Sequence, residues 1–344
     1  MKTLDTSELS FHIEKMLQKS GIKLNYDILE KDYWVVWLLE LLFSGPYTDL
    51  LTFKGGTSLS KAYKVIDRFS EDVDLTIDRS AIALDPAKSL HEPDIGRAQR
   101  TKRNKAFDNS VADFITQEFA PWLDAEIKKH LAGRAGDTAP TLRFDEDDPL
   151  NLFFDYPRKP NATEDVYIKP FVRLELGARG DRSPQAPHMI ISYIEEELPD
   201  AFTNKQSIPV NVLALERTFW EKITILHSVC CRPDDKPPRN RFSRHYYDVH
   251  HLAQDEKLIR RAIEDTELLE AIVENKRIYF FESWDWYPTA KRGTFRLVPS
   301  ATTQKDLAAD YQDMQRMIFG DKPEFSEIIA VLKQLEDRIN QHGK

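Results

Sequence analysis

The sequence predicts an α+β fold, in which a mixed sheet flanked by helices is followed by a helical domain. Two changes of hydrophobic period support this prediction. Apolar residues recur every three or four positions over residues 6–43, alternate with polar residues in short stretches between 50 and 212, and return to helical spacing after Leu213. We therefore expect an α+β domain over 1–205, with a polar insertion near 79–149, and a helical domain over 206–344. The boundary is expected near Lys205.

Length and composition argue against two classes of protein, namely small scaffolds that need metals or disulfides and proteins that coat nucleic acid indiscriminately. The chain has 344 residues, of which 41% are hydrophobic, and 48 Lys plus Arg against 57 Asp plus Glu give a formal net charge of −9. This length can bury a core without metals or disulfides. The net charge argues against indiscriminate coating of nucleic acid but leaves room for a local basic patch.

The sequence predicts a reduced, cytoplasmic protein that does not cross a membrane. The longest apolar stretch, residues 33–43, is interrupted by Glu40 and is far shorter than the roughly 20 residues that a membrane crossing needs. The first ten residues lack a basic segment followed by an apolar one. Cys230 and Cys231 are neighbours, which cannot easily form a disulfide with each other.

The first half of the chain is expected to begin with two helices and then form strands. Residues 6–43 have helical spacing, Leu50–Phe53 is a short apolar strand, and 58–66 is compatible with a helix. Residues 72–78 alternate between apolar and polar side chains, which predicts a half-buried strand. In the polar insertion we expect one helix near 106–119, interrupted by Pro121.

The remaining elements follow from the same patterns. Period-two stretches predict strands over 151–154, 166–176, 189–194 and 208–212. Helical spacing predicts helices over 213–229, 244–253, 258–275, 305–318 and 325–339.

A glycine pair between a strand and a helix is the first feature with chemical meaning. Gly55 and Gly56 expose unpaired backbone amides at the start of a helix, and with the hydroxyls of Thr57 and Ser58 these amides suit a phosphate group. The alternative is an ordinary strand-to-helix turn, which an isolated glycine pair more often forms.

Two acidic residues on the following strand are the second feature. Asp72 and Asp74 are two positions apart, so both carboxylates project from one face and can hold divalent cations such as Mg²⁺. A two-metal site would favour a third carboxylate, and Glu175 is the candidate because it alternates with apolar residues. The alternatives are a solvated strand face for the aspartates and an ion pair with Arg173 or Arg179 for Glu175.

These motifs together resemble a known family. Gly-Gly-Thr-Ser at 55–58 followed by Arg-x-Ser-x-Asp-x-Asp at 68–74 resembles the DNA polymerase β-type nucleotidyltransferase superfamily. Within it, Glu-Lys-Asp-Tyr-Trp-Val at 30–35, Glu-Arg-Thr-Phe-Trp-Glu-Lys-Ile at 216–223 and Arg-His-Tyr-Tyr-Asp-Val at 244–249 resemble the AbiEii/AbiGii toxin family. The last motif departs from the family pattern, because His245 stands where an aspartate is common.

The resemblance implies a nucleotidyltransferase-like fold and a set of site residues. It implies that Thr57 and Ser58 hold the triphosphate of an NTP, that Asp72 and Asp74 hold Mg²⁺ or Mn²⁺, and that Lys222 and Asp248 complete the nucleotide site. Asp248 would either accept a hydrogen bond from the substrate or orient a lysine.

The residues themselves leave alternatives open at these positions. A bound phosphate would compensate the charge of Lys222, which lies beside apolar residues, but Lys222 could instead pair with Glu216 or Glu221. Asp248 could pair with Arg244. Arg68 could pair with Asp72 or reach a phosphate. Residues 31–34 are expected to fix the packing of the first helices.

The activity implied is transfer of a nucleoside monophosphate from an NTP to an RNA acceptor with release of pyrophosphate. The preferred acceptor is the 3′ end of tRNA, in a toxin–antitoxin or phage-defence system with a cognate antitoxin. Two alternatives are a nucleotidyltransferase that modifies a protein or small-molecule hydroxyl, and a non-catalytic NTP-binding partner protein.

Two basic stretches are candidates for RNA contact. Their residues are Arg97, Arg100, Lys102, Arg103 and Lys105, and Arg239, Arg241 and Arg244. The alternative for each stretch is a solvated face or a loop. Either stretch would steer a polynucleotide in a salt-dependent manner only if it flanks the acidic cleft.

Overall fold

The computed structural model describes residues 3–19, 21, 24–85, 88–92, 95–133, 138–158, 168–202, 207–233, 238, 240–280 and 286–341. The chain forms two compact units. The first, here called the sheet unit, comprises 1–62, 70–178 and 185–212, and the second, here called the helical unit, comprises 63–69, 179–184 and 213–344. The predicted boundary at Lys205 lies outside the described residues, and the division into 1–205 and 206–344 remains a prediction.

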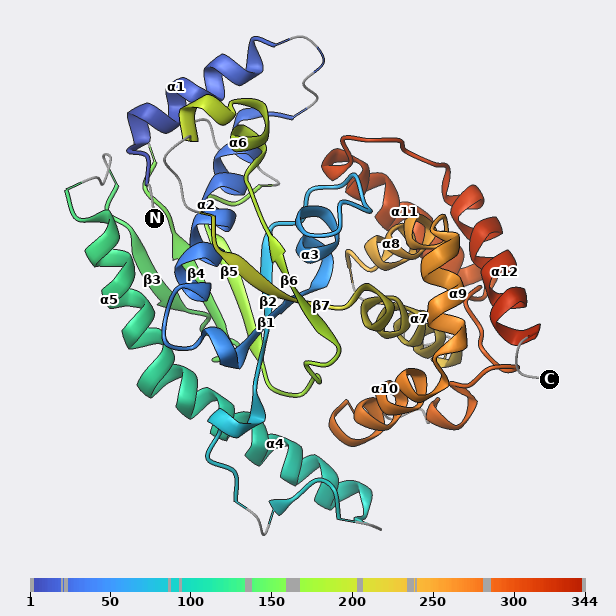
Figure 1. The fold of residues 1–344 in the computed structure, drawn as a ribbon. Helices are drawn as coiled ribbons and strands as arrows, with labels where there is room; N and C mark the ends of the chain where they lie inside the picture. Colours follow the sequence, from blue (N-terminus) through green and yellow to red (C-terminus); the bar gives the residue numbers. More distant parts are fainter. Residues whose placement is uncertain are drawn as a thin grey trace. The chain divides into compact units, whose positions relative to one another are not determined.

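A mixed sheet forms the centre of the sheet unit (Figure 1). In the described residues its strands are β1 (Leu51–Lys54), β2 (Asp72–Ile77), β3 (Thr141–Phe144), β4 (Asn151–Asp155), β5 (Val172–Gly177), β6 (Gln185–Met189) and β7 (Pro209–Leu213), in the order β3-β4-β5-β2-β1-β7-β6. β2 is antiparallel to β1 and parallel to β5, and β1 is parallel to β7. The predicted α+β fold class is therefore confirmed.

The two predicted N-terminal helices are confirmed as α1 (Thr6–Leu17) and α2 (Tyr26–Phe43). The Asp5 side chain accepts hydrogen bonds from backbone amides in the first turn of α1, and Asn25 does the same for α2. The side chains of α2 are almost all buried, and this helix contacts β2 and β5. α2 therefore forms much of the core that supports β2, the strand that carries Asp72 and Asp74.

The polar insertion contains far more helix than we predicted. α4 (Arg97–Phe114) continues through a π-helical turn at Ile115–Phe119 into α5 (Ala120–Leu131), so the interruption predicted at Pro121 is wrong. Proline lacks an amide hydrogen and its ring clashes with the carbonyl four residues earlier. The π turn changes the hydrogen-bond pattern just before Pro121, which then occupies the first turn of α5.

Two other predicted strands need correction. The strand predicted over 189–194 is wrong, because β6 ends at Met189 and a helix, α6 (Tyr193–Glu197), follows. Ser192 starts this helix by accepting a hydrogen bond from the Glu195 amide. The strand predicted over 166–176 begins only at Val172, and residues 166 and 167 lie outside the described part of the chain.

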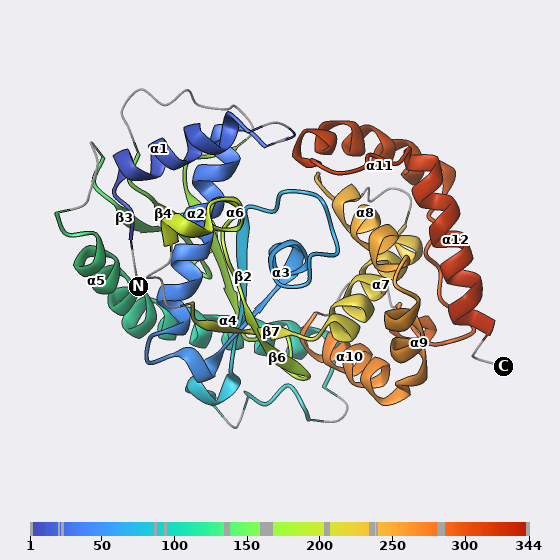
Figure 2. The same ribbon diagram turned by 45° about the horizontal axis from the view of Figure 1, so that its top comes forward.

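The helical unit packs its helices around α7 and α8 (Figure 2). Its helices in the described residues are α7 (Leu215–Cys231), α8 (Ser243–Leu252), α9 (Glu256–Glu264), α10 (Thr266–Tyr279), α11 (Ala301–Met314) and α12 (Phe325–Gln341). The single helix predicted over 258–275 is wrong. Asp265 ends α9, and its carboxylate accepts from the Leu268 amide to start α10.

No helix in the described ranges has both the length and the apolar character that crossing a membrane requires.

His227 is a buried polar residue of the helical unit, and it predicts a dependence of stability on pH. Its Nδ1 accepts from the Arg296 amide at 3.0 Å, and Nε2 lies 3.0 Å from Thr289 Oγ1. Burial lowers the pKa of His227 to about 4. The unfolded chain, whose histidines titrate near pH 6.5, therefore takes up a proton between pH 6.5 and 4 that the folded chain does not. The contribution of His227 to stability falls as pH falls through this window.

A matched variant isolates this effect. Between pH 7 and pH 5 we expect wild type to lose about 2 kcal/mol more unfolding free energy than His227→Gln, at about 1.4 kcal/mol per unit of pKa difference. Urea unfolding at both pH values measures the difference. Parallel pH profiles of the two proteins would contradict the prediction.

Candidate functional site

The glycine turn and the acidic strand lie directly against each other in the sheet unit. Gly55 has a positive φ of 81°, a conformation that favours glycine. A Cβ atom at Gly55 would lie 1.9 Å from Asp74 Oδ2. The Asp74 carboxylate is therefore packed onto the backbone of the turn, with no room for a side chain between them. α3 (Gly55–Lys61) begins at this turn and is shorter than the helix predicted over 58–66.

This contact predicts a large difference between two glycine substitutions. Gly55→Ala is expected to lower the free energy of unfolding by about 2 kcal/mol or more, because alanine resists a positive φ and its Cβ would displace the Asp74 carboxylate. Gly96→Ala is the matched control, since no atom lies within 4 Å of its added Cβ. Urea unfolding measures both, and equal losses would show that the Gly55 contact has no special role.

The two aspartates share one face of β2. Both are partly exposed, whereas Val73 and Leu75 between and after them are buried. In the parallel pairing of β2 with β5, Asp72 is opposite Arg173 and Asp74 is opposite Glu175. The face of the sheet at this point therefore carries three carboxylates and one guanidinium.

Glu175, predicted as a third metal ligand, lies beside Asp74 on this face but forms an ion pair, and its metal role remains a prediction. Its Oε1 lies 2.7 Å from Arg173 Nη1, which is the ion pair that the sequence left as an alternative. Among the residues that the structure describes, no group of three His, Cys, Asp or Glu side chains is placed to hold a metal ion. The pair Asp72 and Asp74 still offers hard oxygen donors on one face, which suits a divalent cation such as Mg²⁺.

The hydroxyls of Thr57 and Ser58 have structural partners in this conformation. Both side chains are buried. Thr57 Oγ1 donates to the Asp72 carbonyl, and Ser58 Oγ donates to the Gly55 carbonyl at 2.9 Å. Thr57 thus ties α3 to the acidic strand. α3 begins without a side-chain cap, which leaves backbone amides of the turn for an anion, and the phosphate contact of the two hydroxyls remains a prediction.

Buried ion pairs hold the elements around the turn, and the sequence did not reveal them. Lys61 on α3 lies 2.8 Å from Asp32 on α2, and Asp32 also accepts from the Tyr193 amide at 2.7 Å. Lys31 lies 2.7 Å from Glu71, immediately before β2. The motif at 30–35 on α2 therefore holds α3 and the start of β2 through ion pairs, in addition to the aromatic packing that we predicted.

Arg68, Lys222 and Asp248 form a buried cluster in the helical unit. Arg68 donates to Asp248 through Nε at 2.7 Å and Nη2 at 2.8 Å, and Lys222 Nζ lies 2.8 Å from Asp248 Oδ2. Although burial opposes ionisation, the two cations hold the pKa of Asp248 well below its usual range. Asp248 is thus ionised and orients Lys222.

The alternative partners proposed for Lys222 are occupied by arginines. Glu216 lies 2.9 Å from Arg261, and Glu221 lies 3.2 Å from Arg217. The pairing of Lys222 with either glutamate is therefore wrong. Asp310 on α11 accepts from the Arg241 and Ser243 amides and so fixes the start of α8, the helix that carries Asp248.

His245 lies one helical turn before Asp248, at the position where the family pattern has an aspartate. Burial, with the nearby charges of Lys222 and Arg244, lowers the pKa of His245 well below its usual value. The imidazole is therefore neutral, and its ring packs edge-on against Phe242 at a centroid distance of 4.8 Å. The substitution replaces an anion with a neutral ring beside Lys222.

The two basic stretches differ from the predicted arrangement. Arg100 and Arg103 on α4 are buried, and Arg103 donates to the Ser89 carbonyl and pairs with Glu92 at 2.7 Å. This burial makes them unsuited to RNA contact. The other predicted contacts in α4, Arg97, Lys102 and Lys105, are exposed. In the second stretch Arg239 lies outside the described residues, Arg241 is exposed and Arg244 is partly exposed.

Comparison with solved structures gives a distant likeness. The nucleotidyltransferase toxin MenT4 (Rv2826c) of Mycobacterium tuberculosis H37Rv is 18% identical, with 97% of this chain and 99% of that chain covered and a TM-score of 0.45. A comparison with curated proteins finds no match. We assign no residue roles from a likeness this distant.

A family comparison is decisive. The model of the family described as nucleotidyl transferase AbiEii toxin, type IV TA system, matches residues 37–331. The match includes the glycine turn, Asp72, Asp74, Lys222 and Asp248, and begins just after the motif at 30–35. Nucleotidyltransferases of this kind use an NTP and a divalent metal ion, and a toxin of this class has a cognate antitoxin. Because the match spans most of the sequence, the chain belongs to the AbiEii family of nucleotidyltransferase toxins of toxin–antitoxin systems.

Proposed function

We propose that this toxin is a Mg²⁺-dependent enzyme that transfers a nucleoside monophosphate from an NTP to the 3′ hydroxyl of tRNA. The acceptor oxygen forms a bond to the α-phosphorus of the NTP, the bond from that phosphorus to the bridging oxygen of the β-phosphate breaks, and pyrophosphate leaves. The hydroxyl proton passes to solvent. The observation that carries the proposal is the contact between the Gly55 turn and Asp74, with Asp72 on the same strand face.

Asp72 and Asp74 are the residues that would hold the metal ion. Their carboxylates are hard donors on one face of β2, as Mg²⁺ prefers, and Mn²⁺ accepts the same ligands. A bound ion of this kind neutralises phosphate charge and lowers the pKa of a coordinated hydroxyl. The turn contributes backbone amides, which suit phosphate oxygens without adding a side chain to the space beside Asp74.

Lys222 is the proposed phosphate contact from the helical unit. Its ammonium has three donors. In the described residues Asp248 is the acidic partner of this ammonium, so donors remain for an anionic ligand. Asp248 then acts as a positioning residue, because its other oxygen is held by Arg68 and its own orientation is fixed. Because Lys222 is already charged and oriented, little conformational entropy of its side chain is lost when it binds a phosphate.

A labelling experiment tests the proposal. Purified protein is incubated with each α-³²P-labelled NTP, total tRNA and Mg²⁺, with and without EDTA. The Asp74→Asn variant serves as the negative control. We expect label in RNA from wild type only, lost with EDTA and recovered with Mg²⁺ or Mn²⁺. Periodate oxidation of the tRNA removes the 3′ hydroxyl and should abolish labelling.

The other outcomes identify the alternatives. Label in protein or in a small molecule, with none in RNA, would replace tRNA by another hydroxyl acceptor. No label in any acceptor, together with measurable NTP binding, would show a non-catalytic NTP-binding protein.

A further inference from the structure

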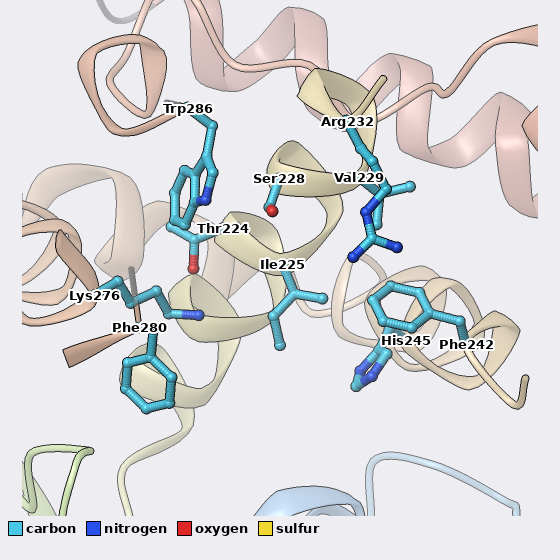
Figure 3. A pocket seen from close by; sticks show the side chains of 10 residues that line it. All are labelled: Thr224, Ile225, Ser228, Val229, Arg232, Phe242, His245, Lys276, Phe280 and Trp286. Atoms are coloured by element: carbon cyan, nitrogen blue, oxygen red, sulfur yellow. The ribbon is translucent and has the colours of Figure 1, made fainter. Parts of the chain in front are cut away.

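A pocket of about 310 Å³ lies within the helical unit (Figure 3). Its lining residues come from the second half of α7, the beginning of α8 and the end of α10, together with Arg232, Phe280 and Trp286. Its size is at the lower end of small-ligand sites, for which about 300–1,000 Å³ is usual, so it suits a single small unit. Of the site residues predicted from the sequence, none that the structure describes lines it.

Two cationic side chains line the pocket, and Lys276 Nζ also donates to the Glu221 carbonyl at 3.2 Å. Lys276 and Arg232 extend into it from two sides, as Figure 3 shows. No aspartate or glutamate is among the lining residues in the described part of the chain. A concave site with two cations attracts an anion of low charge, such as one phosphate group. A triphosphate with its metal ion would also require carboxylates, which these lining residues do not supply.

Aromatic rings supply the second part of the ligand chemistry. Phe242, Phe280 and Trp286 line the same pocket. Phe280 is unusual because 38% of its surface is exposed, although a large apolar side chain gains by burial. The guanidinium of Arg179 lies 5.9 Å from the centre of the Phe280 ring and adds a third cation at this rim.

Aromatic rings beside Arg and Lys are the surface on which single-stranded nucleic acid is held. Bases splayed from an RNA strand stack on such rings, and cations contact the adjacent phosphate. His245 adds a neutral ring to the lining, because burial lowers its pKa. Its imidazole can exchange a hydrogen bond with the edge of a base without repelling the two cations.

We propose that this pocket binds one nucleotide of the acceptor RNA, with the base against Phe280 and Trp286 and the phosphate on Lys276 and Arg232. The proposal rests on the proposed function only in taking RNA as the acceptor. It adds a binding site in the helical unit whose lining residues are not those proposed to hold the metal ion and the NTP phosphates.

Binding measurements with full-length protein test the pocket without requiring catalysis. The probe is a fluorescein-labelled RNA hairpin with a single-stranded 3′ end, and a fluorescent ATP analogue is titrated in parallel. Phe280→Ala and Lys276→Gln are each expected to weaken RNA binding about tenfold while the affinity for the ATP analogue stays within twofold. Lys276→Gln should also reduce the slope of log affinity against log salt concentration by about 1.

Matched controls separate this result from a general loss of structure or charge. Phe11→Ala removes another exposed phenylalanine, and Lys305→Gln removes an exposed lysine, and neither residue lines the pocket. Both should bind RNA like wild type, and thermal unfolding should be alike for all four variants. RNA binding by Phe280→Ala and Lys276→Gln equal to that of the controls would overturn the proposal.

Three further outcomes are decisive. Loss of affinity for the ATP analogue with unchanged RNA binding would assign the pocket to the NTP and overturn our proposal. If wild type labels tRNA but the pocket variants bind RNA normally, only the pocket proposal fails. If wild type transfers label to protein and binds no RNA, the proposed function itself fails.

Discussion

Replacement of Asp248 by alanine is expected to lower the free energy of unfolding by about 3–5 kcal/mol. Asp248 is fully buried, and its carboxylate is the counter-ion of Arg68 and Lys222. Its removal takes from two neighbouring buried cations the carboxylate that compensates part of their loss of hydration. Denaturant unfolding of the full-length chain measures the effect.

A carboxylate of a different kind provides the control. Asp255 accepts hydrogen bonds from the amides of Lys257 and Leu258 at the start of α9, so Asp255→Ala is expected to cost about 1 kcal/mol. A second variant, Asp248→Asn, keeps the shape and removes only the charge, and it should remain well below wild type in stability. The interpretation is wrong if Asp248→Ala is no more destabilising than Asp255→Ala.

The same cluster predicts where on the pH scale its contribution is lost. Because the folded pKa of Asp248 lies below the usual value near 3.9, its stabilisation is present above that value and disappears as pH falls through the folded pKa. This window lies below that of His227, whose contribution falls between pH 6.5 and 4. Acid unfolding should therefore begin with histidine protonation, before the Asp248 cluster is neutralised.

Much of the fold could be predicted because hydrophobic period is a local signal. The helices α1, α2, α7 and α8 and the strands β1, β2 and β7 follow from it directly. The errors occurred where a hydrogen bond to one side chain determines the local structure against the hydrophobic period. Asp265 divides a continuous helical pattern by capping α10, and Ser192 starts α6 where alternation suggested a strand. Capping depends on backbone geometry that a periodic pattern does not contain.

The candidate site was predictable only as far as residues close in sequence determine it. The spacing of Asp72 and Asp74 places both on one strand face, and the structure shows this face. The partner of the Glu175 carboxylate depends on the register of β2 and β5 and on the nearby Arg173, and sequence spacing fixes neither of them. Likewise, Thr57 on α3 donates to the Asp72 carbonyl on β2, which comes within its reach only in the folded chain.

Long-range ion pairs could not be predicted at all. Arg68 and Asp248 are separated by 180 positions, and Lys31 and Glu71 by 40. A charged residue in a sequence is usually solvated, so nothing in the pattern distinguishes these four from the many exposed ones. The aromatic and basic pocket of the helical unit was missed for the same reason, since its lining comes from separate helices.

Asp74→Asn is expected to reduce nucleotide transfer about a thousandfold or more while folding stability stays near that of wild type. The amide has the same shape but lacks the negative charge that holds the cation, and losing about 4 kcal/mol of transition-state stabilisation corresponds to this factor. Asp74 is partly exposed, so the substitution does not remove a fully buried charge. Initial rates of label transfer at fixed NTP and tRNA measure the effect.

Asp78→Asn is the matched control for this prediction. Asp78 follows the end of β2, and its side chain accepts a hydrogen bond from the Ser80 amide at 2.8 Å, an interaction that asparagine preserves. We expect its transfer rate to stay within about twofold of wild type, since surface substitutions away from a site have small effects. Equal losses in the two variants would show that acidic charge anywhere near β2 matters, and normal activity of Asp74→Asn would contradict the metal role.

Raising the Mg²⁺ or Mn²⁺ concentration should restore part of the Asp74→Asn rate, because a weakened cation site fills at higher concentration. Loss of a general base would show no such recovery.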